Sequence, residues 1–179
     1  MQLPTMRPRA EGFVRGCAAL LITLAELLSP GLSLAVSDKA TAVAVADFDN
    51  LDTSGEAPDR TAQHAIRVQD FAGLLRDDLV GVGNYQVVRL QCGQPTCSAT
   101  SLGADALIAT ARRAGARLLV YGGIHKMSTL VQWGELQVVD LEREQLLLRR
   151  SFTFRGDSDE AFRRAAGFIL ENLKDITLR

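Results

Sequence analysis

Apolar and polar positions along the chain alternate with two periods, one typical of strands and one typical of helices. The apolar run Val43–Phe48 predicts a buried strand, and residues 50–60, which include Gly55 and Pro58, predict a polar loop after it. Apolar residues then recur at helical spacing up to residues 81–83, where glycines end the helix. The buried stripe of this helix consists of Val68, Phe71, Leu74, Leu75, Leu79 and Val82.

Two more strands and a helix follow in the middle of the chain. Residues 85–90 and 117–124 are short apolar runs that predict strands. Between them, residues 101–114 have helical periodicity, and Gly115 is the expected left-handed stop. Strands that alternate with helices in this way indicate a partly parallel sheet.

The carboxyl-terminal third differs in kind, because residues 130–142 and 145–156 predict two long strands joined by a short charged turn at 142–144. In the second strand one face is apolar and the other is mostly polar. The apolar face holds Leu146, Leu148, Phe152 and Phe154, and the opposite face holds Leu147, Arg149, Ser151, Thr153 and Arg155. In the first strand the apolar positions change from odd to even residue numbers between Trp133 and Leu136. This change of face predicts a bulge or kink at Gly134.

A final helix begins after the hairpin, with Asp157 and Glu160 placed as a capping box. Its buried stripe consists of Phe162, Ala165, Ile169, Leu173 and Ile176. The predicted order is therefore β-α-β-α-β-β-β-α. This order predicts one α/β (α+β) domain over residues 36–179, with a mixed sheet and a long hairpin before the last helix.

Composition narrows the classes of function. The 179 residues suffice for one domain with a sizeable core, and 47% apolar with 23% charged residues exclude a disordered or fibrous protein. The formal net charge of −1 supplies no long-range field that would attract nucleic acid. We therefore expect no nucleic-acid partner.

Residues 1–35 have the pattern of a secretory signal. Arg7, Arg9 and Arg15 precede the apolar stretch Cys17–Leu28, and small residues lead up to a cleavage site near Ala35. The apolar stretch is shorter than the roughly 20 residues that cross a bilayer, so no transmembrane span is expected after cleavage. The sequence predicts a periplasmic or secreted protein.

Export leaves two cysteines, Cys92 and Cys97, around a Gly-Gln-Pro-Thr turn. In an oxidising compartment this pair predicts a structural disulfide. Zinc would need two further ligands, and the two histidines, His64 and His125, lie far off in sequence. A redox pair is the other alternative, but the spacing is not Cys-x-x-Cys. We expect no metal and no cofactor.

The end of the first strand carries the candidate catalytic residues. Asp47 and Asp49 form an Asp-x-Asp pair like the nucleophile and acid–base pair of a magnesium-dependent phosphatase. After Lys126, however, the chain predicts a hairpin where that fold needs further parallel strands. The competing interpretation is that these acids solvate a strand end, while residues 52–54 turn the chain. We therefore expect no catalytic residue.

Binding residues are expected on the long strands. Lys126 and Ser128 are expected to share one exposed strand face, with His125 opposite, and His64 is expected to be solvated at the start of the first helix. Trp133 is either an anchor for a partner or a core residue. The expected binding residues are Lys126, Ser128, Trp133, Arg149 and Arg155.

Several short motifs together resemble a family of secreted bacterial proteins, the domain of unknown function 2380 family. They are Asp52-Thr53-Ser54, the cysteine pair, Gly115-Ala116, Lys126 with Ser128, Arg155-Gly156 and Asp159-Glu160. The cysteine spacing is wider than in that family, which argues against a redox or metal role. More remotely, the chain is similar to the amino-terminal domain of the Tol-system periplasmic propeller protein and to the curli-secretion lipoprotein.

The family resemblance implies no enzymatic activity. The expected function is therefore a non-enzymatic binding or interaction module of the periplasm or envelope, with a protein partner. Two alternatives stay open. One is a small phosphatase-like hydrolase that uses Asp47 and Asp49, and the other, which the resemblance implies, is an accessory protein of a periplasmic quinoprotein oxidation system.

Overall fold

The computed structural model describes residues 40–174 and 176, so the predicted signal at 1–35 lies outside the described residues. The strands are β1 (Thr41–Val45), β2 (Asp49–Asp52), β3 (Tyr85–Val88), β4 (Leu118–Lys126), β5 (Val131–Asp140) and β6 (Gln145–Arg155). The helices are α1 (Pro58–Val82), α2 (Ala99–Leu102), α3 (Ala104–Arg113) and α4 (Asp159–Lys174). Among these helices, none combines the length and the apolar character that a membrane span requires.

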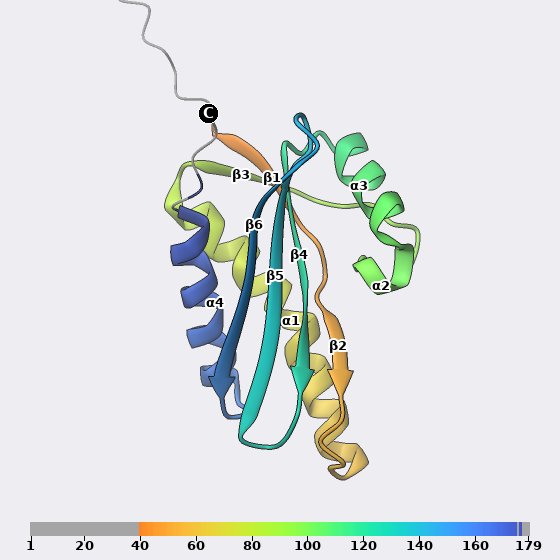
Figure 1. Ribbon diagram of the computed structural model, residues 1–179, viewed down its shortest axis with the longest axis vertical. Helices are drawn as coiled ribbons and strands as arrows, with labels where there is room; N and C mark the ends of the chain where they lie inside the picture. The colour runs from red at the N-terminus through yellow and green to blue at the C-terminus, as the bar shows by residue number, and fades with distance from the viewer. Residues whose placement is uncertain (1–39, 175, 177–179) are drawn as a thin grey trace, which may run out of the picture. The chain divides into compact units, whose positions relative to one another are not determined.

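One six-stranded mixed sheet organises the domain (Figure 1). Five strands follow the order β3-β1-β4-β5-β6, and the sixth, β2, pairs with β4. β1 pairs in parallel with β3 and β4, while β4, β5 and β6 form an antiparallel meander. The predicted α/β class, mixed sheet and long hairpin before the last helix are confirmed. β6 stands at one end of the sheet, directly before α4.

β2 is an additional strand that the sequence did not predict. Residues 49–52, placed mostly in the expected polar loop, pair in parallel with residues 123–126 of β4. β1 covers only residues 118–120 of β4, so the distal half of that long strand is free to accept a second partner. Tertiary pairing therefore makes a strand of Asp-Asn-Leu-Asp, a sequence with little strand propensity of its own.

Helices cover the sheet on both faces and create two cores. α1 and α4 pack on one face, where Val68, Phe71, Leu75, Phe162 and Ile169 belong to the larger core. α3 packs on the other face through Leu107 and Ala111, in a smaller core with Ala44 and Leu119. The predicted apolar stripe is thus confirmed for the last helix, and for the first helix except at Val82, which belongs to neither core.

The predicted middle helix is divided into α2 and α3. Gly103 separates them with φ 84° and ψ 146°, a backbone conformation that a helix cannot contain. Ser98 begins α2 through a reciprocal cap with Ser101. Gly115 has φ 78°, so the expected left-handed stop is confirmed.

Gly134 does not form a bulge, contrary to the sequence prediction. It pairs in register with Ile124 and with Phe152, and a Cβ on this residue would lie 2.3 Å from Cζ of the Phe152 ring. The glycine is therefore needed for the close approach of an aromatic ring. The register shift lies instead between Val138 and Val139, opposite Leu147. As a result Leu147, expected on the polar face, packs against the larger core, and Leu146 is exposed.

The capping prediction for α4 was wrong. Ser158 Oγ accepts the Ala161 amide at 3.3 Å and so caps the helix in place of Asp157. Glu160 is exposed and pairs with Arg163 and Arg164. The Asp157 side chain instead forms ion pairs, which are described in the next subsection.

Candidate functional site

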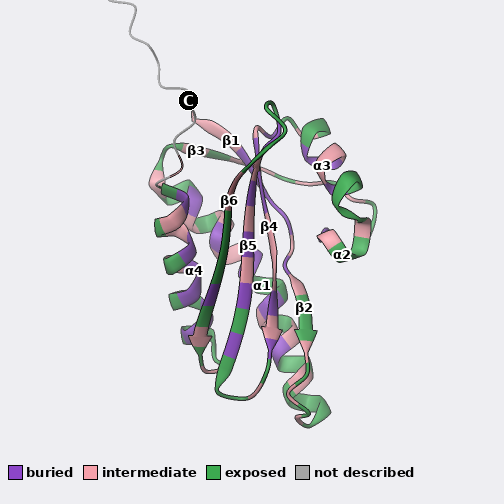
Figure 2. Cartoon of the chain, viewed as in Figure 1, coloured by how far each residue is buried: buried purple, intermediate pink, exposed green. Residues whose placement is uncertain are grey.

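The outer side of the β5–β6 hairpin forms an open sheet surface. We define the hairpin face as Val131, Trp133, Glu135, Gln137, Arg149, Ser151, Thr153 and Arg155, which the antiparallel register places on one side of the sheet. α3 packs against Leu119 and Val139, at the far end of this side. Exposed and buried residues alternate along β5, as Figure 2 shows. No helix of the described residues covers the hairpin face.

A chain of hydrogen bonds fixes the polar half of the hairpin face. Arg149 donates two hydrogen bonds of 3.1 Å to Glu135, one to each carboxylate oxygen. Gln137 donates to Glu135 at 2.9 Å, and Tyr121 donates to Gln137 at 2.9 Å. Burial, followed by the nearby Glu135 charge, raises the pKa of Tyr121. The chain crosses β4, β5 and β6, so these side chains are held in one arrangement.

The other half of the hairpin face combines Val131 and Trp133 with Thr153 and Arg155. Trp133 is 37% exposed and stands opposite His125 of β4 and Thr153 of β6. Next to it, Leu51 of β2 is 55% exposed, in register with His125. His125 Nε2 lies 2.7 Å from Thr53 Oγ1, which fixes its ring. Trp133 is therefore partly exposed and belongs to neither core.

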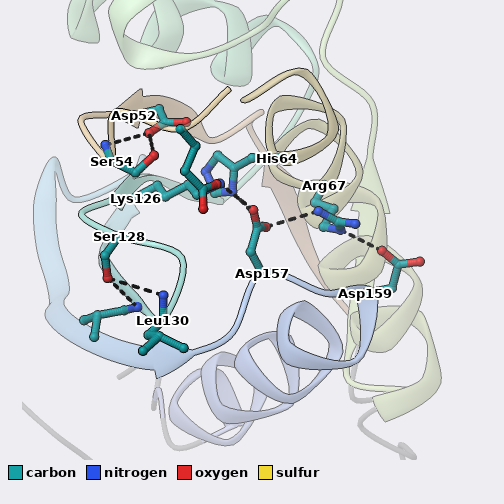
Figure 3. Close-up of polar contacts among 11 residues, drawn as sticks. Asp52, Ser54, His64, Arg67, Lys126, Ser128, Leu130, Asp157 and Asp159 are labelled. Atoms are coloured by element: carbon teal, nitrogen blue, oxygen red, sulfur yellow. Dashed lines mark hydrogen bonds and ion pairs between the residues drawn. The ribbon is translucent and has the colours of Figure 1, made fainter. Parts of the chain in front are cut away.

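Lys126 does not belong to this surface, which corrects the prediction of an exposed strand face. Its side chain is fully buried, and its Nζ contacts Glu56 and lies 2.7 Å from Asp157 Oδ2. Ser128 lies beyond the end of β4, where its Oγ accepts the amides of Leu130 and Val131 at 3.3 and 3.2 Å (Figure 3). Lys126 and Ser128 therefore stabilise the structure and do not form an exposed pair.

Asp157 is the centre of the buried ion cluster, defined as Glu56, His64, Arg67, Lys126, Asp157 and Asp159. His64 Nδ1 lies 3.0 Å from Asp157 Oδ1, and Arg67 contacts Asp157 at 3.3 Å and Asp159 at 2.9 Å (Figure 3). His64 is completely buried, so the prediction of a solvated histidine was wrong. The cluster joins α1, the end of β4 and the connection from β6 to α4, and it therefore fixes the base of the hairpin.

The pKa values of the cluster follow from these contacts. Burial by itself raises the pKa of Asp157, but hydrogen bonds and charges from Lys126 and His64 lower it below its ordinary value. Burial by itself lowers the pKa of Lys126, and the bonds to Asp157 and Glu56 raise it above its ordinary value. Lys126 is therefore charged and cannot act as a neutral base for a serine.

Asp47 and Asp49 are both engaged in hydrogen bonds that hold the backbone. Asp47 Oδ1 accepts Arg76 at 2.9 Å, and its Oδ2 accepts the Cys97 amide at 2.8 Å. Asp49 accepts the Thr100 amide at the start of α2, at 3.1 Å. The described residues contain no group of three or more histidine, cysteine or acidic side chains that could hold a metal ion. These acids therefore do more than solvate a strand end, because they attach the cysteine loop and α2 to β1 and β2.

The cysteine loop at residues 92–97 and the turn at residues 52–54 both have the structures that the sequence predicted. A disulfide joins Cys92 and Cys97, with the Cα atoms 5.6 Å apart. Asp52 accepts both the amide and the hydroxyl of Ser54, at 2.9 and 2.6 Å. These bonds form the expected turn after β2. Burial by itself raises the pKa of Asp52, but the hydrogen bonds from Ser54 lower it below its ordinary value.

Sequence reasoning missed four members of the buried ion cluster: Glu56, His64, Arg67 and Asp157. One signal was present, because His64 lies four residues before Val68 and so continues the apolar stripe of α1. Glu56 and Asp157 lie in connections without periodicity, and no spacing in the chain links them to Lys126.

Comparison with protein families identifies residues 41–173 as a protein of unknown function (DUF2380). The chain belongs to the DUF2380 family. This confirms the resemblance found in the sequence. No curated protein matches the chain.

The solved structures that are similar to this chain have low sequence identity. The hypothetical protein CT253 from Chlamydia trachomatis has 8% identity and a TM-score of 0.52, with 76% of this chain and 97% of that chain covered. The PelC dodecamer from Paraburkholderia phytofirmans has 18% identity and a TM-score of 0.48, with coverages of 78% and 89%. TolB from Acinetobacter baumannii matches over 78% of this chain and 28% of its own, with 14% identity and a TM-score of 0.41. These comparisons concern the fold alone.

Proposed function

We propose that this DUF2380 protein is an exported, non-enzymatic interaction module that binds a partner protein in the periplasm or envelope through the hairpin face. The observation that carries the proposal is the hairpin face itself, an open sheet surface that contains the partly exposed Trp133. No helix of the described residues covers it, and it includes the terminal strand β6. Tryptophan, tyrosine and arginine are the residues most enriched at binding hot spots.

The edge of β6 supports strand addition as the mode of binding. Among the described strands, β6 pairs with β5 alone, so its other side has backbone donors and acceptors available to an extended segment. β6 carries no acidic residue, and of its arginines Arg149 is paired with Glu135 while Arg150 and Arg155 make no ion pair among the described residues. A second copy of β6 would bring arginines against arginines, whereas an acidic segment would be attracted. The proposed partner therefore presents an acidic, extended segment.

Export rests on the signal pattern of residues 1–35 and is supported by the disulfide. A disulfide persists in an oxidising compartment, and the periplasm is one. The absence of enzymatic activity is supported by the engagement of Asp47 with Arg76 and with the cysteine loop. The hydrolase alternative predicts that the purified protein, given magnesium, cleaves a chromogenic phosphate ester, and that Asp47→Asn abolishes the turnover. The proposal predicts no turnover for either protein.

A site-specific crosslink tests the binding surface directly. A photoreactive amino acid at Thr153, exposed in the middle of the hairpin face, is expected to capture one periplasmic protein in living cells. The same photoreactive residue at Glu171, exposed on α4, serves as the positional control and is expected to capture none. Mapping the captured peptide identifies whether it is acidic and extended.

Charge reversal supplies the matched comparison. Arg149→Glu with Arg155→Glu is expected to abolish the Thr153 adduct, because the acidic segment is then repelled. Arg163→Glu with Arg164→Glu makes the same change in net charge on α4 and is expected to leave the adduct intact. Circular dichroism confirms folding of each variant. Loss of the adduct in both double variants, or in neither, contradicts binding at the hairpin face.

A further inference from the structure

A second site lies at the carboxyl ends of β1 and β3, where the two crossover connections diverge. From β1 the chain passes through α1 on the face of the larger core, and it returns through β3. From β3 it passes through α3 on the face of the smaller core to reach β4. Adjacent parallel strands whose connections leave to opposite faces form a crevice outside their carboxyl ends, and ligands of open α/β sheets bind there.

A groove of about 530 Å³ occupies this crevice. Its walls come from α1, from the end of β3 and from the cysteine loop. Val80, Val87, Leu90 and Pro95 form apolar parts of the wall, and Arg76, Asp77, Arg89 and Gln94 supply polar groups. Its volume is in the range of small-molecule sites, and its mixture of apolar walls with a few polar groups is typical of them.

Asp47 orients one of the arginines in the groove. The Arg76 guanidinium donates to the Val45 carbonyl from Nε at 3.1 Å and from Nη2 at 2.7 Å, and its Nη2 also donates to Asp47. Asp47 is held in turn by the Cys97 amide, and the Asp47 amide donates to the Cys97 carbonyl at 3.0 Å. The disulfide loop, Asp47 and Arg76 are thus one connected unit, in which Arg76 is fixed before any ligand arrives.

Gly73 keeps the groove open from the side of α1. Glycine within a helix lowers its stability relative to alanine, so a packing reason for it is expected. A Cβ at Gly73 would have no atom within 4 Å, which excludes close packing as the reason. Gly73 lines the groove, so a side chain at this position would project into the space that a ligand needs.

The charges of the groove decide the class of ligand. Asp47 is already neutralised by Arg76, which leaves Arg89 and Asp77, neither of which is ion-paired within residues 40–174. One exposed positive and one exposed negative group, neither of them ion-paired within that range, match a molecule that carries a carboxylate and an ammonium group, and Asp77 would repel a dianion. We propose that the groove binds a small zwitterion of the amino-acid or short-peptide class, with its carboxylate on Arg89 and its ammonium group on Asp77.

The test is isothermal titration calorimetry of the purified protein with the dipeptide alanyl-leucine and two blocked forms. The N-acetylated form removes the ammonium charge, and the carboxyl amide removes the carboxylate. Alanyl-leucine is expected to bind, and each blocked form is expected to lose at least about tenfold in affinity, the effect of one charged hydrogen bond. Equal binding of all three forms, or no binding of alanyl-leucine, overturns the proposal.

Two pairs of variants place the ligand in this groove. Gly73→Met is expected to abolish binding by filling the space, while Gly81→Met, on the same helix but outside the groove lining, is expected to bind normally. Arg89→Gln is expected to lose at least about tenfold in affinity, while Arg150→Gln on β6 is not. Loss of binding in a control variant, or retention in Gly73→Met, overturns the assignment. The partner adduct at Thr153 is independent of these results.

Discussion

The buried ion cluster provides the sharpest test of the structure, through the substitution Asp157→Asn. One carboxylate connects three cationic or ionisable groups, with Oδ2 at 2.7 Å from Lys126 and Oδ1 at 3.0 Å from His64 and 3.3 Å from Arg67. Asparagine keeps the shape of the side chain but removes its charge. Lys126, with no exposure to solvent, then retains Glu56 as its remaining counter-ion.

The expected loss follows from burial. Removing one partner of a buried ion pair costs about 3 to 5 kcal/mol, because the other charge is left without compensation. Asp157 keeps 13% of its side chain exposed and Glu56 still pairs with Lys126, so we expect the lower end, about 3 kcal/mol in the free energy of unfolding. For a domain of this size, such a loss lowers the melting temperature by roughly 6 to 12 °C.

The loss should also depend on pH in a definite direction. The pKa of Asp157 in the folded protein lies below its ordinary value of 3.8, which describes the unfolded chain. A lowered pKa contributes stability that is fully present above the unfolded value and disappears as the pH falls through the folded value. The difference in the free energy of unfolding between the wild type and Asp157→Asn should therefore shrink below about pH 4.

Urea unfolding followed by circular dichroism at pH 7, 5 and 3 measures both effects. Asp159→Asn is the matched control, because Asp159 is 77% exposed and contacts Arg67 alone among the cations of the cluster. It should cost less than about 1 kcal/mol, as exposed ion pairs do. The reasoning is refuted if the two variants lose equal stability, or if the Asp157→Asn loss at pH 3 equals that at pH 7.

Three further predictions concern other parts of the chain. Replacing both Cys92 and Cys97 by serine should lower the free energy of unfolding by about 1 to 3 kcal/mol without loss of the fold, because the closed loop is short. A bound metal or two free thiols in the protein from its host would contradict a structural disulfide. Gly134→Ala should cost about 1 to 3 kcal/mol through its clash with the Phe152 ring, and Phe152→Leu should reduce that cost in a double-mutant cycle; additive losses would argue against the contact. Amino-terminal sequencing of the protein from its host should start near Val36, and a protein that still begins at residue 1 would refute export.

Local periodicity determined the elements whose stability is local. The stripe of α4 and the alternation of exposed and buried residues along β5 could be read from the sequence, because each reflects the side-chain period of one element. The arginine and threonine side chains of the hairpin face were placed for the same reason. Once residues 145–155 are a strand, Arg149 and Thr153 must share a side.

Pairing between distant strands decided what periodicity left open. β2 exists because β4 extends past the end of β1 and accepts a second parallel partner. Gly134 suggested a bulge from its own sequence, but its role depends on Phe152, which is opposite it in β6. Neither feature leaves a signal within its own segment.

The two charged sites depended most on tertiary structure. Lys126 looked like an exposed strand residue, but Glu56 and Asp157 approach it from connections 70 residues before and 31 residues after it in the chain and make its complete burial possible. Asp47 looked like a nucleophile, but Arg76 and the Cys97 amide occupy both of its oxygens. The sequence by itself determined most of the elements, most of their apolar faces and the family. The folded chain alone determined which charges are paired, because the energy of a charge depends on partners and solvent exposure that residues distant in sequence supply.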